Sequence, residues 1–141
     1  MDFETVKKEL IADEDKRNFA YKCTAGKTTI GIGRNLDDKG ISDQEIDLLF
    51  KNDFHEVVDD LDNIFIDFRK YPQEFQHILF NMRFQLGSKG FRGFKNMIAA
   101  CHSLSLKKIE EEMMDSEWYT VDTPERAKRL VDRVRRLRTG E

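Results

Sequence analysis

Three side chains that can move a proton or direct an attack lie near the start of the sequence. They are the carboxyl group of Glu14, the thiol of Cys23 and the hydroxyl of Thr29. A carboxyl group can donate a proton, and a thiol or hydroxyl can make or direct an attack. The spacing brings the three groups to the mouth of one predicted hairpin, but spacing alone specifies no reaction because these groups are common.

The hairpin is predicted from two short runs rich in aromatic and β-branched residues, 18–23 and 27–33. Between them, Thr24-Ala25-Gly26 is a turn signal. If residues 24–28 form a five-residue loop, the side chain of Cys23 faces that of Thr29 across the ladder, with β-carbons roughly 4.5 to 5.5 Å apart. Ile30 and Ile32 in the second run are expected to point to a core.

The same stretch contains fragments of two nucleotide-binding signatures. Gly26-Lys27-Thr28 ends like a P-loop, but Tyr21 stands where the first glycine should be. Gly31 and Gly33 begin a dinucleotide fingerprint whose third glycine would be Leu36. Both signatures miss a glycine, so the stretch is better interpreted as the second strand of the hairpin.

Helical periodicity dominates the rest of the chain. Apolar spacing predicts a short helix over residues 3–12, and Ser42 with Glu45 forms a capping box before a long helix. Further helices are predicted after Pro72 and over residues 96–102, 105–117 and 124–137. The fold class predicted from this pattern is α+β and mostly helical.

Composition limits the remaining possibilities. A chain of 141 residues with eleven phenylalanines is long enough for one domain with a real core. It has no run of eighteen apolar residues and no visible signal peptide, so we expect it to appear first in a cytoplasm. Cys23 and Cys101 are too few for a disulfide framework and lack zinc-site spacing, so we expect free thiols and no cofactor or metal.

Charge is distributed unevenly along the chain. Residues 37–67 carry a net charge of −9, whereas residues 124–138 carry +5. A basic segment can favour a polyanion, but a solvated helix face that balances the acidic region is the simpler interpretation. No aromatic platform or known reading motif accompanies the basic segment, so no nucleic-acid partner is expected.

Three ordered segments resemble one known family. Glu14, eight residues, Cys23, five residues and Thr29 are similar to the Glu-x8-Asp/Cys-x5-Thr signature of phage-type lysozymes, the muramidase endolysins. The hairpin sequence YKCTAGKTTIGIGRNL resembles that of the family. NMRFQLGSKGFRGFKNM resembles its helix and turn, and SEWYTVDTPERAKRLV its Trp-Tyr segment and Arg-rich final helix. The likeness runs in order from about Leu10 to Val131.

The resemblance implies a single lysozyme-like domain with two lobes. The hairpin lobe would cover about residues 14–41, a linking helix about 42–63, and a helical lobe about 64–141 together with residues 1–12. It also implies hydrolysis of the β-1,4 bond between N-acetylmuramic acid and N-acetylglucosamine in peptidoglycan, which requires no cofactor.

In this reaction the resemblance makes Glu14 the general acid, with Cys23 and Thr29 guiding the attacking water. A free glutamic acid has a pKa of about 4.3, so a cleft would have to raise it. Cys23 stands where many relatives carry Asp, and an ordinary thiol is mostly neutral at pH 7. A thiolate could activate water or attack the sugar, and we favour water. A small buried hydrophobe is the alternative interpretation of Cys23.

The resemblance also assigns supporting residues. Arg126 matches the arginine that pairs with the catalytic glutamate. Arg34 stands where several relatives carry His, and Asp53 could pair with it as a structural strut. Substrate contacts are expected at Asn35, Phe84, Met97 and Glu112, although Phe84 is equally plausible in a core.

Two other functions are compatible with parts of the sequence. The chain could be a catalytically weak or inactive lysozyme relative that binds peptidoglycan. A cysteine hydrolase would need a histidine beside Cys23, yet all three histidines lie on predicted helices. An endolysin would wait in the host cytoplasm of a phage-infected bacterium until a separate membrane-permeabilising protein opened a path to the wall. We expect a monomer.

Overall fold

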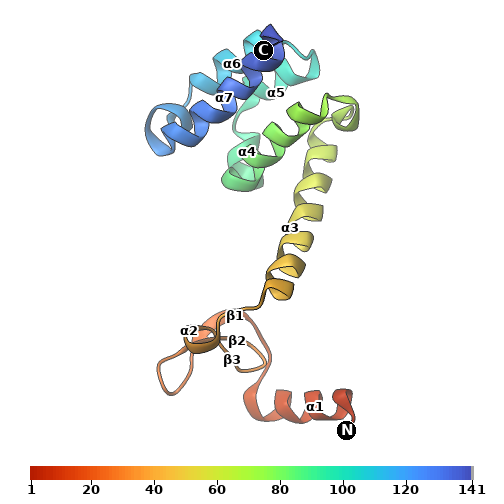
Figure 1. The fold of residues 1–141 in the computed structure, drawn as a ribbon, viewed down its shortest axis with the longest axis vertical. Coiled ribbons are helices and arrows are strands. Elements are labelled where there is room, and N and C mark those ends of the chain that lie inside the picture. Colours follow the sequence, from red (N-terminus) through yellow and green to blue (C-terminus); the bar gives the residue numbers. More distant parts are fainter. Residues whose placement is uncertain (141) are drawn as a thin grey trace. The chain divides into compact units, whose positions relative to one another are not determined.

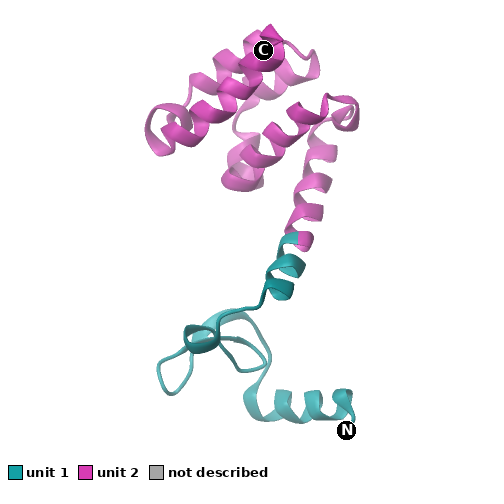
Figure 2. Ribbon diagram, viewed as in Figure 1, with its two compact units in different colours: residues 1–50 teal, residues 51–141 magenta. Residues whose placement is uncertain are grey.

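The computed structural model describes residues 1–140. The chain is mostly helical, with one small antiparallel sheet (Figure 1). It divides into two compact units, one from Met1 to Phe50 and the other from Lys51 onward (Figure 2). The predicted α+β, mostly helical class is confirmed.

The first unit holds the sheet and three helical segments. These are α1 (Phe3–Glu14), β1 (Arg17–Lys22), β2 (Thr28–Gly31), β3 (Arg34–Asn35), α2 (Leu36–Lys39) and the beginning of α3 (Asp43–Ile64). The predicted capping box opens α3, since the backbone N–H of Ser42 donates to Glu45 Oε1 at 2.9 Å and that of Glu45 to Ser42 Oγ at 3.2 Å.

The hairpin register differs from the prediction. Tyr21, not Cys23, pairs with Thr29, and the backbone N–H of Cys23 donates to the Lys27 carbonyl at 2.9 Å. The loop is therefore three residues long and ends on Gly26, whose φ of 79° matches the left-handed position of such loops. The error is two residues, so Cys23 and Thr29 still lie on the same face of the sheet.

The second unit is a helical assembly around one core. It contains the rest of α3, a 3-10 turn η1 (Phe68–Lys70), α4 (Gln73–Arg92), α5 (Lys95–His102), α6 (Leu106–Met114), a π-helical turn η2 (Trp118–Asp122) and α7 (Pro124–Thr139). Gly87, with a φ of 74°, kinks α4 where the sequence predicted a glycine-punctuated connection. Helix α7 packs against α4, α6 and η2.

Burial is concentrated in the second unit. Every fully buried apolar side chain among residues 1–140 lies at Val57 or beyond, including Phe65, Phe75 and Phe91. In the first unit only Thr29 is buried. Ile30 and Ile32, expected to point to a core, are partly buried and line a largely apolar cavity of about 840 Å³.

The basic segment is neutralised in part within its own unit. Arg135 and Arg138 both pair with Glu110, at 2.7 and 3.1 Å, and Arg133 pairs with Glu74 at 2.6 Å. These contacts fit the simpler interpretation of a charged helix face better than that of a free polyanion site.

Both cysteines are free thiols, as expected. The predicted long helix corresponds to α3, whereas the assignment of residues 1–12 to a helical lobe stays a prediction. Within residues 1–140, no helix combines the length and the hydrophobicity needed to cross a bilayer.

Candidate functional site

Cys23 and Thr29 form a small polar arrangement beside the hairpin loop. Thr29 follows the first residue of β2 and is only 4% exposed. Its hydroxyl donates to the Lys27 carbonyl at 2.9 Å. Cys23 is the residue after β1 and lies diagonally across the ladder from Thr29, so their side chains are neighbours on one face.

The environment of Cys23 favours the thiolate. Backbone hydrogen bonds from Lys27 and Ala25 lower the pKa of the Cys23 thiol below its ordinary value. Donors aimed at sulfur stabilise its charged form more than its neutral form. A lowered pKa raises the fraction of the thiol that is present as thiolate near neutral pH, and the thiolate is the form that can accept a proton or act as a nucleophile.

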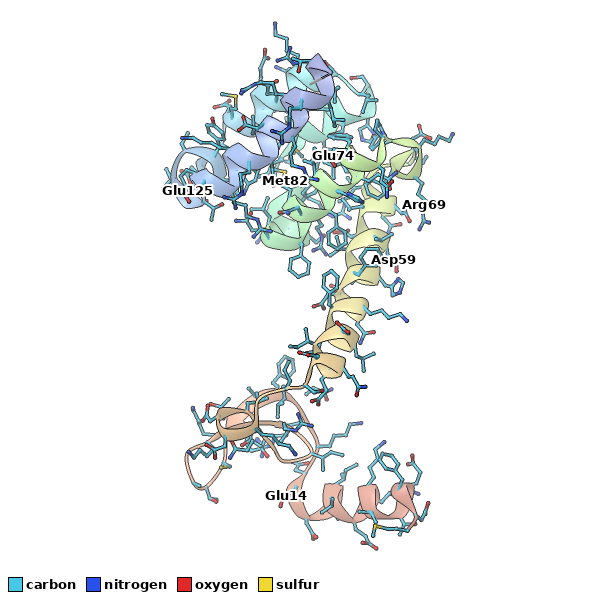
Figure 3. The ribbon with its side chains drawn as sticks, in the orientation of Figure 1. Glu14, Asp59, Arg69, Glu74, Met82 and Glu125 are labelled. Atoms are coloured by element: carbon cyan, nitrogen blue, oxygen red, sulfur yellow. The ribbon has the colours of Figure 1, made fainter. Side chains whose placement is uncertain are left out.

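Glu14 is the last residue of α1, where the chain turns toward β1 (Figure 3). Asp15 ends the helix with a φ of 70° and donates its backbone N–H to Ile11. The Glu14 carboxylate lies against Gly33 in the turn after β2. A β-carbon built at Gly33 would be 3.2 Å from Glu14 Oε2. The Glu14 side chain is exposed, unlike the desolvated acid that the sequence predicted.

Two of the three predicted catalytic residues therefore belong to one hairpin, and the third contacts it. Cys23 and Thr29 lie together near its loop, while Glu14 contacts the turn at the other end of β2. Asn35 pairs with Thr29 across β2 and β3. Its side chain caps α2 by accepting from the backbone N–H of Asp38 at 3.0 Å, so it has a structural role as well as the predicted rim position.

Arg34 has a different carboxylate partner from the one the sequence suggested. Its guanidinium donates to Glu45 Oε1 at 2.9 Å and to the Gly40 carbonyl at 3.2 Å. The Arg34 guanidinium, with Ser42, lowers the pKa of Glu45 to about 2. Asp53 is exposed, and its pairing with Arg34 stays a prediction.

Arg126 is held by an amide. Its Nε and Nη2 donate to Asn81 Oδ1 at 3.0 and 2.7 Å, which joins the first turn of α7 to α4. Because the acceptor is a neutral amide, these hydrogen bonds do not balance the charge of the guanidinium. The ion pair with Glu14 that the resemblance implies stays a prediction.

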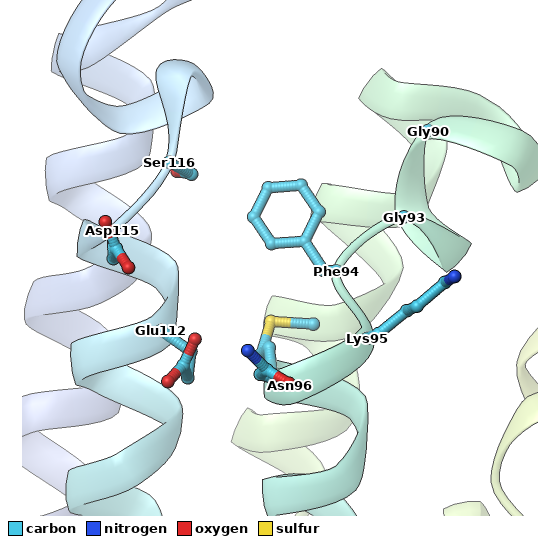
Figure 4. A pocket seen from close by; sticks show the side chains of 9 residues that line it. Gly90, Gly93, Phe94, Lys95, Asn96, Glu112, Asp115 and Ser116 are labelled. Atoms are coloured by element: carbon cyan, nitrogen blue, oxygen red, sulfur yellow. The ribbon is translucent and has the colours of Figure 1, made fainter.

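Two of the predicted substrate residues meet in the second unit. Met97 and Glu112 line a cavity of about 560 Å³ between the start of α5 and the end of α6 (Figure 4). Met97 is only 1% exposed and belongs to the core, so its side chain mainly packs and offers little surface to a substrate. Glu112 is 17% exposed and pairs with Lys108 at 3.0 Å.

Phe84 lies in an aromatic row on α3 and α4. It stacks on Phe80 at a centroid distance of 6.1 Å, and Phe80 contacts Phe54 at 5.3 Å. Phe84 is 45% exposed, so it is not a core residue. An exposed ring remains compatible with its predicted contact to substrate.

Two residues with clear roles were not predicted from the sequence. Glu45 was recognised only as a helix cap, although an acid in a capping box is also available to a nearby arginine. Asn81 stands at the start of the quoted helix segment, but nothing in its local pattern names Arg126 as its partner.

Comparison with models of known protein families finds no match to this chain, and comparison with curated proteins finds none either. Among residues 1–140, no group of three or more His, Cys, Asp or Glu side chains could hold a metal ion.

Proposed function

We propose that the protein is a lysozyme-like glycoside hydrolase of peptidoglycan. It would cleave the β-1,4 bond between N-acetylmuramic acid and N-acetylglucosamine, with Glu14 as general acid and Cys23 and Thr29 directing the attacking water. The observation that carries the proposal is the position of Cys23 beside the buried Thr29, with backbone donors that lower the pKa of the thiol.

The hydrogen bonding of Thr29 suits a water-guiding role. A hydroxyl has one proton, and that of Thr29 is donated to the Lys27 carbonyl. Its free lone pairs can then accept one proton of a water molecule, while the Cys23 thiolate accepts the other. As the water oxygen bonds to the anomeric carbon, the thiolate takes up a proton and Glu14 delivers its own to the departing sugar oxygen. This series of steps inverts the anomeric configuration.

The position of Glu14 also supports the assignment. Gly33 has no side chain, so the carboxylate can lie against the turn backbone. A protonated Glu14 is needed for donation, and substrate that displaces water from this exposed group would favour its neutral form.

The test is incubation of purified peptidoglycan with the wild type and with Glu14→Gln. The wild type should release new reducing ends, and mass analysis should find fragments cut between the two sugars. Glu14→Gln keeps the size of the side chain but has no acid proton to give. Fragments cut only in the peptide part, or equal rates for the two proteins, would refute the proposal.

A second candidate is a relative that binds peptidoglycan with little or no cleavage. The exposed side chain of Glu14 favours it, because the general acids of glycosidases lie in pockets that exclude water. It predicts sedimentation with peptidoglycan but no reducing ends. Under either candidate we propose that the protein reaches the wall from the host cytoplasm with the help of a separate membrane-permeabilising protein.

A further inference from the structure

The backbone of Lys27 contacts both Cys23 and Thr29. Its carbonyl accepts the Cys23 N–H at 2.9 Å and the Thr29 hydroxyl, also at 2.9 Å. A backbone hydrogen bond from Lys27 is also the main cause of the lowered pKa of the Cys23 thiol. The position of this one peptide segment therefore decides where the thiol and the hydroxyl lie and how readily the thiol ionises.

Asp37 holds the residue that follows Lys27. Strand β3 ends at Asn35, which pairs with Thr29, and the chain then enters α2. Thr28 therefore lies one residue beyond the ladder between β2 and β3, and its N–H donates to Asp37 Oδ2 at 2.8 Å. A hydrogen bond to an ionised acceptor is stronger than one to a neutral acceptor. The bond from Thr28 lowers the pKa of Asp37, so Asp37 is a carboxylate at neutral pH.

The short helix α2 fixes Asp37 against the hairpin. It packs on β2 and β3 (Figure 1). Its next residue, Asp38, accepts from Lys27 Nζ at 3.2 Å. The Asn35 amide binds α2 in turn, since it accepts from the Asp38 N–H at 3.0 Å and donates to Asp38 Oδ2 at 2.9 Å. Two adjacent carboxylates of α2 thus bind two adjacent residues, 27 and 28, and a shift of these residues would break both contacts.

We infer that Asp37 is a positioning residue of the proposed active site, which holds residues 27 and 28 so that the Cys23 thiol and the Thr29 hydroxyl face the same water. The catalytic part of this inference rests on the proposed function, whereas the hold on the loop follows from the hydrogen bonds. Asp37 acts through the backbone of residues 27 and 28 and takes no part in the chemistry.

Replacement of Asp37 has opposite effects on Cys23 through charge and through position. Loss of a nearby negative charge by itself favours the thiolate, whereas loss of the loop geometry weakens the hydrogen bonds that stabilise the thiolate. Asp37→Ala removes both the charge and the acceptor. Asp37→Asn removes the charge but keeps an oxygen that can accept the Thr28 N–H. The cations near Asp37, Lys22 and Lys27, are the same in both variants.

The reactivity of Cys23 tests this position without substrate. The rate of alkylation by iodoacetamide is followed by mass spectrometry across neutral and alkaline pH. Cys101 is buried, and burial raises the pKa of its thiol to about 12, so it should not react in the folded protein. In Asp37→Ala, Cys23 should titrate at higher pH and react about three-fold or more slowly at neutral pH, because the thiolate is the reactive form. Asp37→Asn should react at least as fast as the wild type.

Cleavage of peptidoglycan is measured in parallel. Reducing-end release should fall about ten-fold in Asp37→Ala, as expected for a small misplacement of reacting groups, and stay within about two-fold of the wild type in Asp37→Asn. Asp47→Ala is the matched control, because Asp47 is an exposed acid on α3 in the same unit. It should match the wild type in both assays, and thermal melting should show that all three variants are folded.

A measurement on the wild type keeps the test decisive if Asp37→Ala does not fold. The Thr28 amide should exchange its hydrogen at least about ten-fold more slowly than its intrinsic rate. An unprotected Thr28 amide, unchanged or faster alkylation of folded Asp37→Ala, or slowed alkylation of Asp37→Asn would overturn the inference. Full cleavage by folded Asp37→Ala rejects the positioning role alone. The expected alkylation rates without cleavage by the wild type reject only the hydrolase.

Discussion

In the proposed mechanism, Cys23 is the residue with the largest consequence for the chemistry. A thiol is an unusual replacement for a carboxylate because its ordinary pKa is about 8.5 rather than about 3.9. Two backbone hydrogen bonds, from Lys27 and Ala25, lower the pKa of the thiol. The loop geometry thus offsets part of the chemical difference between a thiol and an aspartate.

Substitutions at Cys23 test this role directly. We expect Cys23→Asp to retain activity and Cys23→Ala to lose about 100-fold in kcat, the lower range for removal of a general base. The measurement is the initial rate of reducing-end release from peptidoglycan. An alanine variant as active as the wild type would show that Cys23 only packs.

The wild type and Cys23→Asp should differ in how their activity depends on pH. In the proposed mechanism the thiolate is the active form of Cys23, so activity should rise as pH increases through the pKa of the thiol and fall on the acid side. Because that pKa is lowered, the rise in kcat/KM should lie at a lower pH than for an unperturbed thiol, and Cys23→Asp should move it to still lower pH. An unchanged acid limb in Cys23→Asp would contradict the assignment of the base.

At the scale of elements, the turn between β2 and β3 positions Glu14. Gly31 and Gly33 have φ angles of 70° and 68°, which favour glycine. Only Gly33 also lies against another side chain, because a β-carbon at Gly31 would meet nothing within 4 Å. Substitutions at the two glycines can therefore distinguish the effect of backbone strain from the effect of contact with Glu14, the proposed general acid.

Gly33→Ala and Gly31→Ala form a matched pair. Each should destabilise the fold by about 1–2 kcal/mol, the cost of a left-handed conformation for alanine. Gly33→Ala should in addition lower kcat about ten-fold or more, since displacing a reacting group by a fraction of an ångström is costly. Urea unfolding gives the first quantity and peptidoglycan cleavage the second. If both variants lose the same activity, the contact with Glu14 has no catalytic importance.

At the scale of the whole molecule, burial differs sharply between the two units. The buried apolar side chains all belong to residues from Val57 onward, whereas the first unit buries Thr29 alone among residues 1–50. Regions with few buried apolar contacts open locally at low free-energy cost. The chemistry proposed here thus depends on the less buried unit.

Native-state hydrogen exchange should reveal this difference. Backbone amides of α4 and α7 should be protected at least about ten-fold more strongly than those of β1 and β2, because the helices surround the core. The experiment is amide exchange followed by NMR at neutral pH, with rates corrected for the intrinsic exchange of each residue. Equal protection of strands and core helices would show that the hairpin is stabilised by contacts beyond its own unit.

The sequence by itself determined the local elements of this protein. The capping box of Ser42 and Glu45, the Pro124 helix start and the Thr-Ala-Gly turn all act through neighbouring backbone groups, so their effects could be predicted without the fold. The helical periodicity gave the class for the same reason, and the spacing of Glu14, Cys23 and Thr29 supplied the candidate chemistry.

Tertiary structure alone decided the partners and the fine geometry. A three-residue loop ending on a left-handed glycine set the hairpin register, so Thr29 pairs with Tyr21. Arg34 pairs with Glu45, and Arg126 donates to Asn81. The sequence offers several polar groups for each arginine, and only the packing of the chain decides which of them lies within hydrogen-bond distance. Met97 is buried in the core, whereas Glu112 is partly exposed. Burial depends on which helices pack together, and the spacing of residues along the chain does not specify that packing.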